Sequence, residues 1–114
     1  MTLDEARSFA LSLPGAVEAP HFDYTSFRVR GKIFATAPPD GGRLHVFVDE
    51  HAVGVAVGVV PDALEELHWG KKLAGVVVHL DRADSEIVRD LLEESWRRRA
   101  SKGQIREREE RSAG

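Results

Sequence analysis

Residues 26–36 read SFRVRGKIFAT, with apolar and basic side chains alternating on both sides of a single glycine. A period of two residues is the pattern of a β-strand, and the glycine favours a two-residue hairpin turn at positions 30–31 or 31–32. We expect the turn to be basic and exposed and one face of the hairpin to join the core. The alternation places Phe27, Val29 and Phe34 on that core face and Arg28, Ile33 and Ala35 on the other.

A helix is predicted before the hairpin. Thr2 and Glu5 have the spacing of a capping box, and apolar residues follow at helical intervals, which predicts a helix over residues 3–13. Pro14-Gly15 ends it, because proline restricts the residue before it and glycine accepts a left-handed turn. We expect residues 18–23 to form a loop that leads into the hairpin.

The middle of the chain is less uniform. Turn-forming residues at 38–42 and an alternating run over 44–48 predict a third strand and a three-stranded meander. Residues 50–58 are compatible with a strand, from their valines, or with a short helix capped by Asp49. The composition of residues 62–67 favours a helical turn. Residues 73–80 predict a strand that is central or buried on both faces, with His79 partly buried.

A second amphipathic helix is predicted to begin at Asp84 or Ser85. Its apolar stripe includes Trp96, which we expect in the core. Arg97-Arg98-Arg99 follow at the end of this helix, where positive charge suits the helix dipole, so they need no ligand to explain them. We expect the charged tail, residues 101–114, either to extend the helix or to be disordered.

Composition excludes several classes of protein. A chain of 114 residues fits one domain, and the lack of cysteine excludes disulfides, thiolate nucleophiles, cysteine zinc sites and iron-sulfur clusters. The N-terminus lacks the pattern of a signal peptide, and the longest apolar run, residues 52–60, is far shorter than the roughly 20 residues that span a bilayer. We therefore expect a cytoplasmic protein with no membrane partner.

Positive charge is concentrated in three segments. The formal net charge is −3, but residues 26–36, 67–83 and 97–114 are each net positive, so the rest of the chain is strongly acidic. Such segments are commonly solvated loops and helix ends. A generic polyanion binder would carry an overall positive charge, so the position of these segments matters more than the sum.

Four short motifs resemble the MmcQ/YjbR family in order and spacing: LPG at 13–15, FRVRGKIFA at 27–35, HWGKK at 68–72, and a helix containing ESW at 94–96. The resemblance covers residues 1–100 as a single domain, with 101–114 as a tail. It implies a compact two-layer α+β fold of the frataxin (CyaY)-like kind, an antiparallel sheet with helices packed on one face. The same fold is described as a double-wing DNA-binding motif. For residues 63–67 the resemblance implies a strand where the composition favours a helical turn, and both remain open.

The resemblance makes DNA the expected partner. Lysine and arginine on projecting loops replace counterions at phosphates, and a neighbouring aromatic ring can stack on a sugar or an unpaired base. A basic hairpin edge also deters aggregation, and tryptophan is more often a core or lid residue than a stacking platform. The candidate nucleic-acid-binding residues are Arg28, Arg30, Lys32, His68, Trp69, Lys71 and Lys72.

We expect no enzyme, cofactor or metal. The five histidines lack the i, i+4 spacing of helical metal ligands, and nucleophile-elbow, Walker and dinucleotide motifs are missing. Frataxin uses an acidic helix ridge for iron, whereas the first helix offers only Asp4 and Glu5. The alternative to DNA binding is a non-catalytic module whose sheet face or cleft binds a protein or small molecule. It would be favoured if the basic residues scatter, or pair with Glu65, Glu66 or Glu94.

Overall fold

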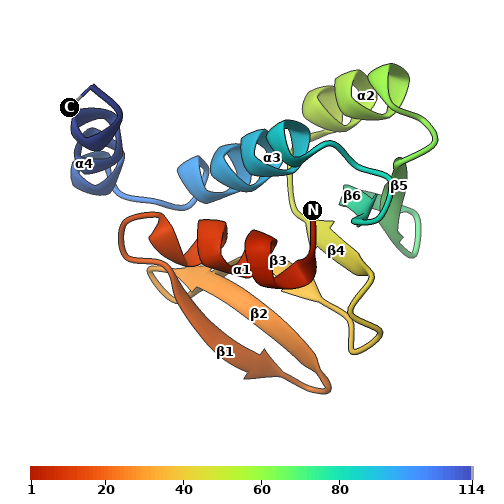
Figure 1. The fold of residues 1–114 in the computed structure, drawn as a ribbon, viewed down its shortest axis with the longest axis horizontal. Coiled ribbons are helices and arrows are strands. Elements are labelled where there is room, and N and C mark those ends of the chain that lie inside the picture. The colour runs from red at the N-terminus through yellow and green to blue at the C-terminus, as the bar shows by residue number, and fades with distance from the viewer. Residues whose placement is uncertain (114) are drawn as a thin grey trace.

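A six-stranded antiparallel sheet and four helices make up the α+β fold of residues 1–113, the part of the chain that the computed structural model describes (Figure 1). The strand order is β1-β2-β3-β4-β6-β5. No helix in this part of the chain is long and apolar enough to cross a membrane. The elements are α1 (Leu3–Ser12), β1 (Val17–His21), β2 (Tyr24–Val29), β3 (Lys32–Ala37), β4 (Arg43–Val46), α2 (Glu50–Val59), β5 (Leu64–Trp69), β6 (Lys72–His79), α3 (Ser85–Arg97) and α4 (Lys102–Ala113).

The predicted basic hairpin is formed by β2 and β3, and β4 completes the predicted meander. Its turn is Arg30-Gly31, where both φ angles are positive, 55° and 74°. Two positive φ angles are typical of a type I′ turn, whose twist matches that of the flanking strands. The glycine therefore serves as the second central residue of the tightest hairpin connection.

A β-bulge changes which residues of this hairpin face the core. The register shifts between Phe27 and Arg28, so that Phe27 lies opposite Ala35 while Arg28 lies opposite Ile33. Phe34 is the extra residue, and both it and Ala35 are fully buried. Our expectation that Ala35 faces away from the core is wrong, because a bulge interrupts the strict alternation on which it depended.

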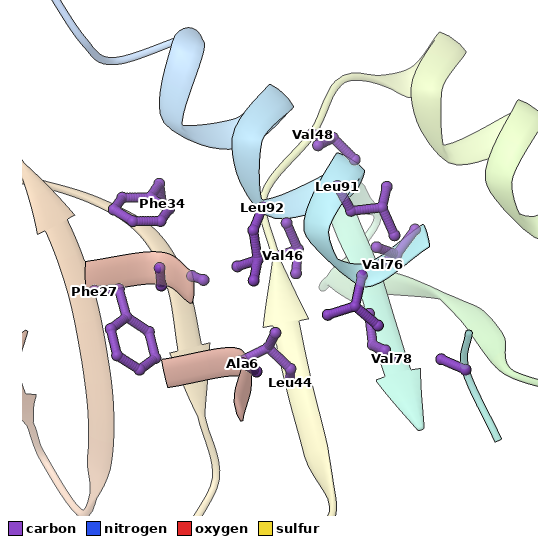
Figure 2. Close-up of a cluster of buried hydrophobic side chains, with 14 of the residues drawn as sticks. Ala6, Phe27, Phe34, Leu44, Val46, Val48, Val76, Val78, Leu91 and Leu92 are labelled. Atoms are coloured by element: carbon purple, nitrogen blue, oxygen red, sulfur yellow. The ribbon is translucent and has the colours of Figure 1, made fainter. Parts of the chain in front are cut away.

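The core lies between the sheet and the helices α1 and α3 (Figure 1). Trp96 of α3 is fully buried as predicted, and its indole Nε1 donates a hydrogen bond to the carbonyl oxygen of Pro14 at 3.0 Å, which ties the end of α3 to the end of α1. Figure 2 shows side chains of both layers meeting in the core: Ala6 from α1, Phe27, Phe34, Leu44, Val46, Val76 and Val78 from the sheet, and Leu91 and Leu92 from α3.

Residues 17–21 form an edge strand, β1, where we predicted a loop. Proline lacks the N–H that a central strand needs, but an edge strand tolerates it on the side that has no partner. Ser26 of β2 is buried, and its Oγ donates to the carbonyl oxygen of Ala19 at 2.7 Å, which adds a side-chain bond to the backbone ladder.

The segment between β4 and β6 contains a helix and a strand. Residues 50–58, left open between helix and strand, belong to α2, and Asp49 caps it by accepting a hydrogen bond from the backbone N–H of Ala52. For residues 63–67, left open between a helical turn and a strand, the strand that the resemblance implies is correct, because β5 begins at Leu64 and pairs with β6; the helical turn that the composition of 62–67 favours is wrong. Glu65 of β5 bonds His79 of β6 at 2.7 Å, and His79 is partly buried as predicted.

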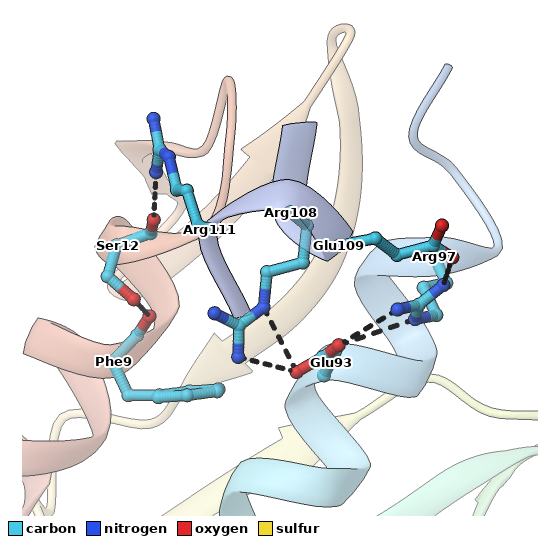
Figure 3. A network of polar contacts seen from close by, with 7 residues as sticks. All are labelled: Phe9, Ser12, Glu93, Arg97, Arg108, Glu109 and Arg111. Atoms are coloured by element: carbon cyan, nitrogen blue, oxygen red, sulfur yellow. Dashed lines mark hydrogen bonds and ion pairs between the residues drawn. The ribbon is translucent and has the colours of Figure 1, made fainter. Parts of the chain in front are cut away.

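Residues 102–113 form a separate helix, α4, after a turn that ends α3, so they neither continue α3 nor lack structure. Figure 3 shows how α4 is held. Glu93 of α3 accepts hydrogen bonds from Arg108 of α4 and from Arg97, and Arg111 donates to the carbonyl oxygen of Ser12 in α1. The tail is thus attached to both core helices by polar contacts.

Candidate nucleic-acid interface

The two basic hairpin turns lie at the same end of the sheet. Every neighbouring pair of strands is antiparallel, so in the order β2-β3-β4-β6-β5 the strands β2 and β5 run in the same direction. The β2–β3 turn and the β5–β6 turn therefore project from one edge. Three strand spacings of roughly 4.8 Å separate the midlines of the two hairpins.

Four of the predicted cations are exposed at this edge. Arg30 and Lys32 flank Gly31 in the first hairpin, and Lys71 and Lys72 belong to the second. None of the four forms an ion pair with another residue that the structure describes. Their charges are therefore free to meet an external anion.

The end of α3 supplies two further cations between the hairpins. Arg98 donates from Nη1 to the carbonyl oxygen of Phe47 at 3.0 Å, just past the end of β4, the strand between the hairpins. Arg30 donates to the carbonyl oxygen of Arg99 at 3.4 Å, which fixes the backbone of Arg99 beside the first turn. Burial and the neighbouring Arg98 lower the pKa of Arg99. We name Arg30, Lys32, Lys71, Lys72, Arg98 and Arg99 the cationic edge.

Arg98 and Arg99 are missing from the residues proposed on sequence grounds, because the helix dipole already accounted for positive charge at that position. The sequence shows three consecutive arginines at 97–99, but their surroundings in the structure differ. Arg97 pairs with Glu93 and Glu109, whereas Arg98 and Arg99 have no carboxylate partner among residues 1–113. Only the three-dimensional position distinguishes the paired arginine from the two others.

Arg28 lies apart from the cationic edge. Its Nε donates to Ser26 Oγ at 2.9 Å, and its guanidinium also reaches the carbonyl oxygen of Pro20 at 3.5 Å. Pro20 is opposite Thr25, three residues back along β2, so the guanidinium is directed away from the turn and toward β1. The structure therefore gives Arg28 bonding partners within the sheet and does not bring it to the other cations.

Trp69 and His68 at the end of β5 differ in their surroundings. Trp69 is 58% exposed, so it is not a core residue, and its ring packs at 5.1 Å, tilted by 55°, against the ring of Phe47. His68 is exposed and its Nε2 lies 2.9 Å from Oε1 of Glu66 on the same strand. Trp69 thus offers an accessible aromatic surface beside the cations, whereas His68 already has an acidic partner.

A cavity of about 760 Å³ lies on the face of the sheet that is directed away from the core. Its floor includes Thr36 and His45, which are cross-strand partners and alternate with the core-facing residues of β3 and β4. Burial lowers the pKa of His45, and the charge of Arg43 lowers it further. Lys72, Arg98 and Trp69 line the cavity at the cationic edge. No cluster of three or more histidine or carboxylate side chains suited to a metal occurs within residues 1–113.

Comparison with known proteins identifies the family to which the chain belongs. Residues 11–98 match the family model described as YjbR. A crystal structure of Deinococcus radiodurans protein DR2400, described as containing the domain DUF419, superposes with a TM-score of 0.71 at 25% sequence identity, over 83% of this chain and 75% of that one. The comparison with curated proteins found no match. Because the family model spans more than half of its length, the chain belongs to the YjbR family.

Proposed function

We propose that this protein binds DNA, contacting phosphates through the cationic edge with little discrimination between sequences. The observation that carries the proposal is that two hairpin turns at the same end of one sheet, with the end of α3 between them, present six cations without carboxylate partners among the described residues. Each cation that replaces a counterion at a phosphate contributes favourably to binding. The resemblance to the frataxin-like, double-wing fold supports the same proposal.

The residue types at the edge account for the low sequence discrimination. Bidentate pairing with base edges is typical of arginine, asparagine and glutamine on elements that enter a groove. Three members of the edge are lysines, Lys32, Lys71 and Lys72, which act as point charges, and Arg30 and Arg98 already donate to backbone carbonyls. We propose phosphate contacts at the edge and assign no catalytic step to the protein.

The alternative is a module that binds a protein or small molecule in the cavity of the sheet, with the edge serving only solubility. Glu65 pairs with His79, and Glu66 pairs with His68 of the second basic loop, but neither carboxylate pairs with a lysine or arginine of the two loops. The six cations therefore keep their charges unpaired among residues 1–113, which favours a polyanion over the alternative.

Titration of labelled DNA at increasing salt tests the proposal. With about four phosphate contacts, affinity should fall on the order of 100-fold between 50 and 200 mM salt, from a slope of roughly 0.9 per contact. Changing Lys32, Lys71 and Lys72 together to glutamate should abolish this binding. The matched control changes Arg43, Arg82 and Arg89, exposed cations of which Arg43 and Arg82 lie at the start of β4 and after the end of β6, the opposite end of the sheet, to glutamate and should keep most of it. A flat salt response, or equal binding by the two variants, would overturn the proposal.

A further inference from the structure

We propose that the cavity on the open face of the sheet binds one nucleotide unit, with its base on the aromatic wall of Phe47 and Trp69 and its phosphate at Lys72, Arg98 and Arg99. This inference rests on the proposed function and deepens it. A base can reach the cavity only when it is unpaired, so the nucleic acid bound at the cationic edge would be single-stranded.

The size and place of the cavity suit a small ligand. Its volume of about 760 Å³ is within the range of roughly 300–1,000 Å³ that is usual for sites of small molecules and cofactors. It adjoins the cationic edge, because Lys72, Arg98 and Arg99 belong to its lining. Single-stranded DNA bound along the cationic edge would therefore pass beside the cavity.

The aromatic wall is built for stacking. Phe47 is 7% exposed and fixed at the end of β4, and Trp69 lies against it while keeping 58% of its surface exposed. A large aromatic surface left open beside cations is the arrangement that single-strand-binding proteins use, since every base has a face that can stack. The packing of Trp69 on Phe47 fixes the orientation of the open ring.

A second exposed aromatic residue lies at the other end of the cavity. Phe22 is 92% exposed, lines the cavity and has a φ of 58°, a left-handed conformation that a bulky side chain rarely adopts. Strain of this kind is concentrated at ligand-binding positions. Aromatic rings therefore border the cavity near both ends of the strands, the β1–β2 turn and the end of β5.

The charges of the lining favour an anionic ligand at the edge. Arg98 and Arg99 are sequence neighbours with no carboxylate partner among residues 1–113, and burial together with Arg98 lowers the pKa of Arg99. A bound phosphate would relieve this repulsion. The acidic residues of the lining are Asp23, beside Phe22 in the β1–β2 turn, and Asp49, which caps α2.

The floor offers groups that can bond the edge of a base. The ring of His45 lies 5.9 Å from that of Tyr24, and both line the cavity. Because burial lowers the pKa of His45, its imidazole is neutral at pH 7 and keeps one donor and one acceptor. These two side chains can accept or donate hydrogen bonds, so the floor is compatible with more than one base.

The test compares three probes: an oligothymidylate single strand, a DNA duplex of the same length, and thymidine monophosphate. Tryptophan fluorescence reports on the site directly, since Trp96 is fully buried and Trp69 is exposed. We expect the single strand to quench Trp69 and to bind at least about fivefold more tightly than the duplex, from a stacking contribution of roughly 1–3 kcal/mol per base. Quenching by the monophosphate as well would place a free nucleotide in the same cavity.

Variants separate stacking from a general loss of structure. Trp69→Ala should lower single-strand affinity by at least about fivefold and leave duplex affinity within about twofold, whereas Trp69→Phe should restore the preference, as measured by anisotropy of labelled DNA. Val59→Ala, which trims an exposed apolar residue of α2 outside this cavity, is the control and should change neither affinity.

The outcomes distinguish this inference from the proposed function. Salt-dependent binding with equal affinity for strand and duplex, unaffected by Trp69→Ala, would overturn the nucleotide site and leave the cationic edge intact. Quenching by the monophosphate without binding of either DNA would overturn DNA binding and the single-stranded partner, and would leave only a site for a free nucleotide. Absence of binding and of quenching for all three probes would overturn both.

Discussion

Replacing Gly75 with alanine should destabilise the protein strongly, because β4 passes too close to this position. A Cβ on Gly75 would lie 2.1 Å from the carbonyl oxygen of Val46 and 3.0 Å from Cα of Phe47. The first distance is more than about 1 Å short of a normal contact, and both neighbours are backbone atoms that cannot rotate away. Either β4 or β6 would have to move within the sheet.

The size of the effect follows from two opposing contributions. Overpacking a buried site typically costs about 1–3 kcal/mol, and a clash with backbone belongs to the upper part of that range. Alanine recovers about 0.5–1 kcal/mol by restricting the unfolded chain. We therefore expect Gly75→Ala to lower the free energy of unfolding by about 2 kcal/mol.

Urea denaturation followed by the fluorescence of buried Trp96 measures this loss. The matched control is Gly54→Ala in the exposed interior of α2, where a Cβ would meet no atom within 4 Å and where alanine should add about 0.5–1 kcal/mol. The two variants thus make the same chemical change with opposite expected signs. A Gly75→Ala protein as stable as the wild type would refute the close approach of β4 to β6 on which the reasoning depends.

Two further predictions concern α3. Trp96→Phe removes the indole donor to Pro14 and leaves unfilled volume in the core, so urea denaturation should show a free energy of unfolding lower by about 2–3 kcal/mol. A decrease of less than about 0.5 kcal/mol would mean that this hydrogen bond does not tie the ends of α1 and α3 together. For Glu93, burial raises the pKa, but hydrogen bonds and charge from Arg108 and Arg97 outweigh it and hold the pKa below its ordinary value of 4.5. The ion pairs of Glu93 therefore contribute fully to the stability of the fold above pH 4.5, and this contribution is lost as the pH falls through the lowered pKa. Glu93→Gln should lower the free energy of unfolding by about 1–2 kcal/mol near neutral pH and by much less in acid, as measured by urea denaturation at the two pH values. An equal decrease at the two pH values would contradict this dependence on the ionisation of Glu93.

The elements that could be predicted are those whose signals are local. The capping box of Thr2 and Glu5 forms as expected, and the apolar stripe that ends with Trp96 marks α3 correctly. The strands β1 and β5 have no such signal, since Pro20 and the pair Glu65-Glu66 are unfavourable for a strand. Their backbone groups are nonetheless satisfied by β2 and β6, the strands that follow each of them after a two-residue turn, so pairing in a hairpin overrides the unfavourable side chains.

The same distinction applies to the cationic edge. Arg28 and Arg30 look equivalent in the sequence, two residues apart on one hairpin, yet Arg28 bonds within the sheet and Arg30 reaches the end of α3. Charge and exposure at the turns could be predicted, because a hairpin tip must be solvated. Which turns share an end of the sheet depends on the strand order, and this order brings Arg98 and Arg99 between them.

The net charge of −3 is compatible with a polyanion partner for a physical reason. At physiological ionic strength the Debye length is about 8 Å, so exposed acidic groups farther than this from a bound phosphate repel it only weakly. The six cations of the edge have no carboxylate partner among residues 1–113, so a phosphate bound to one of them lies next to an unpaired positive charge. The electrostatic potential at such a phosphate is therefore set mainly by the six cations of the edge, and the net charge of the chain is a poor guide to its partner.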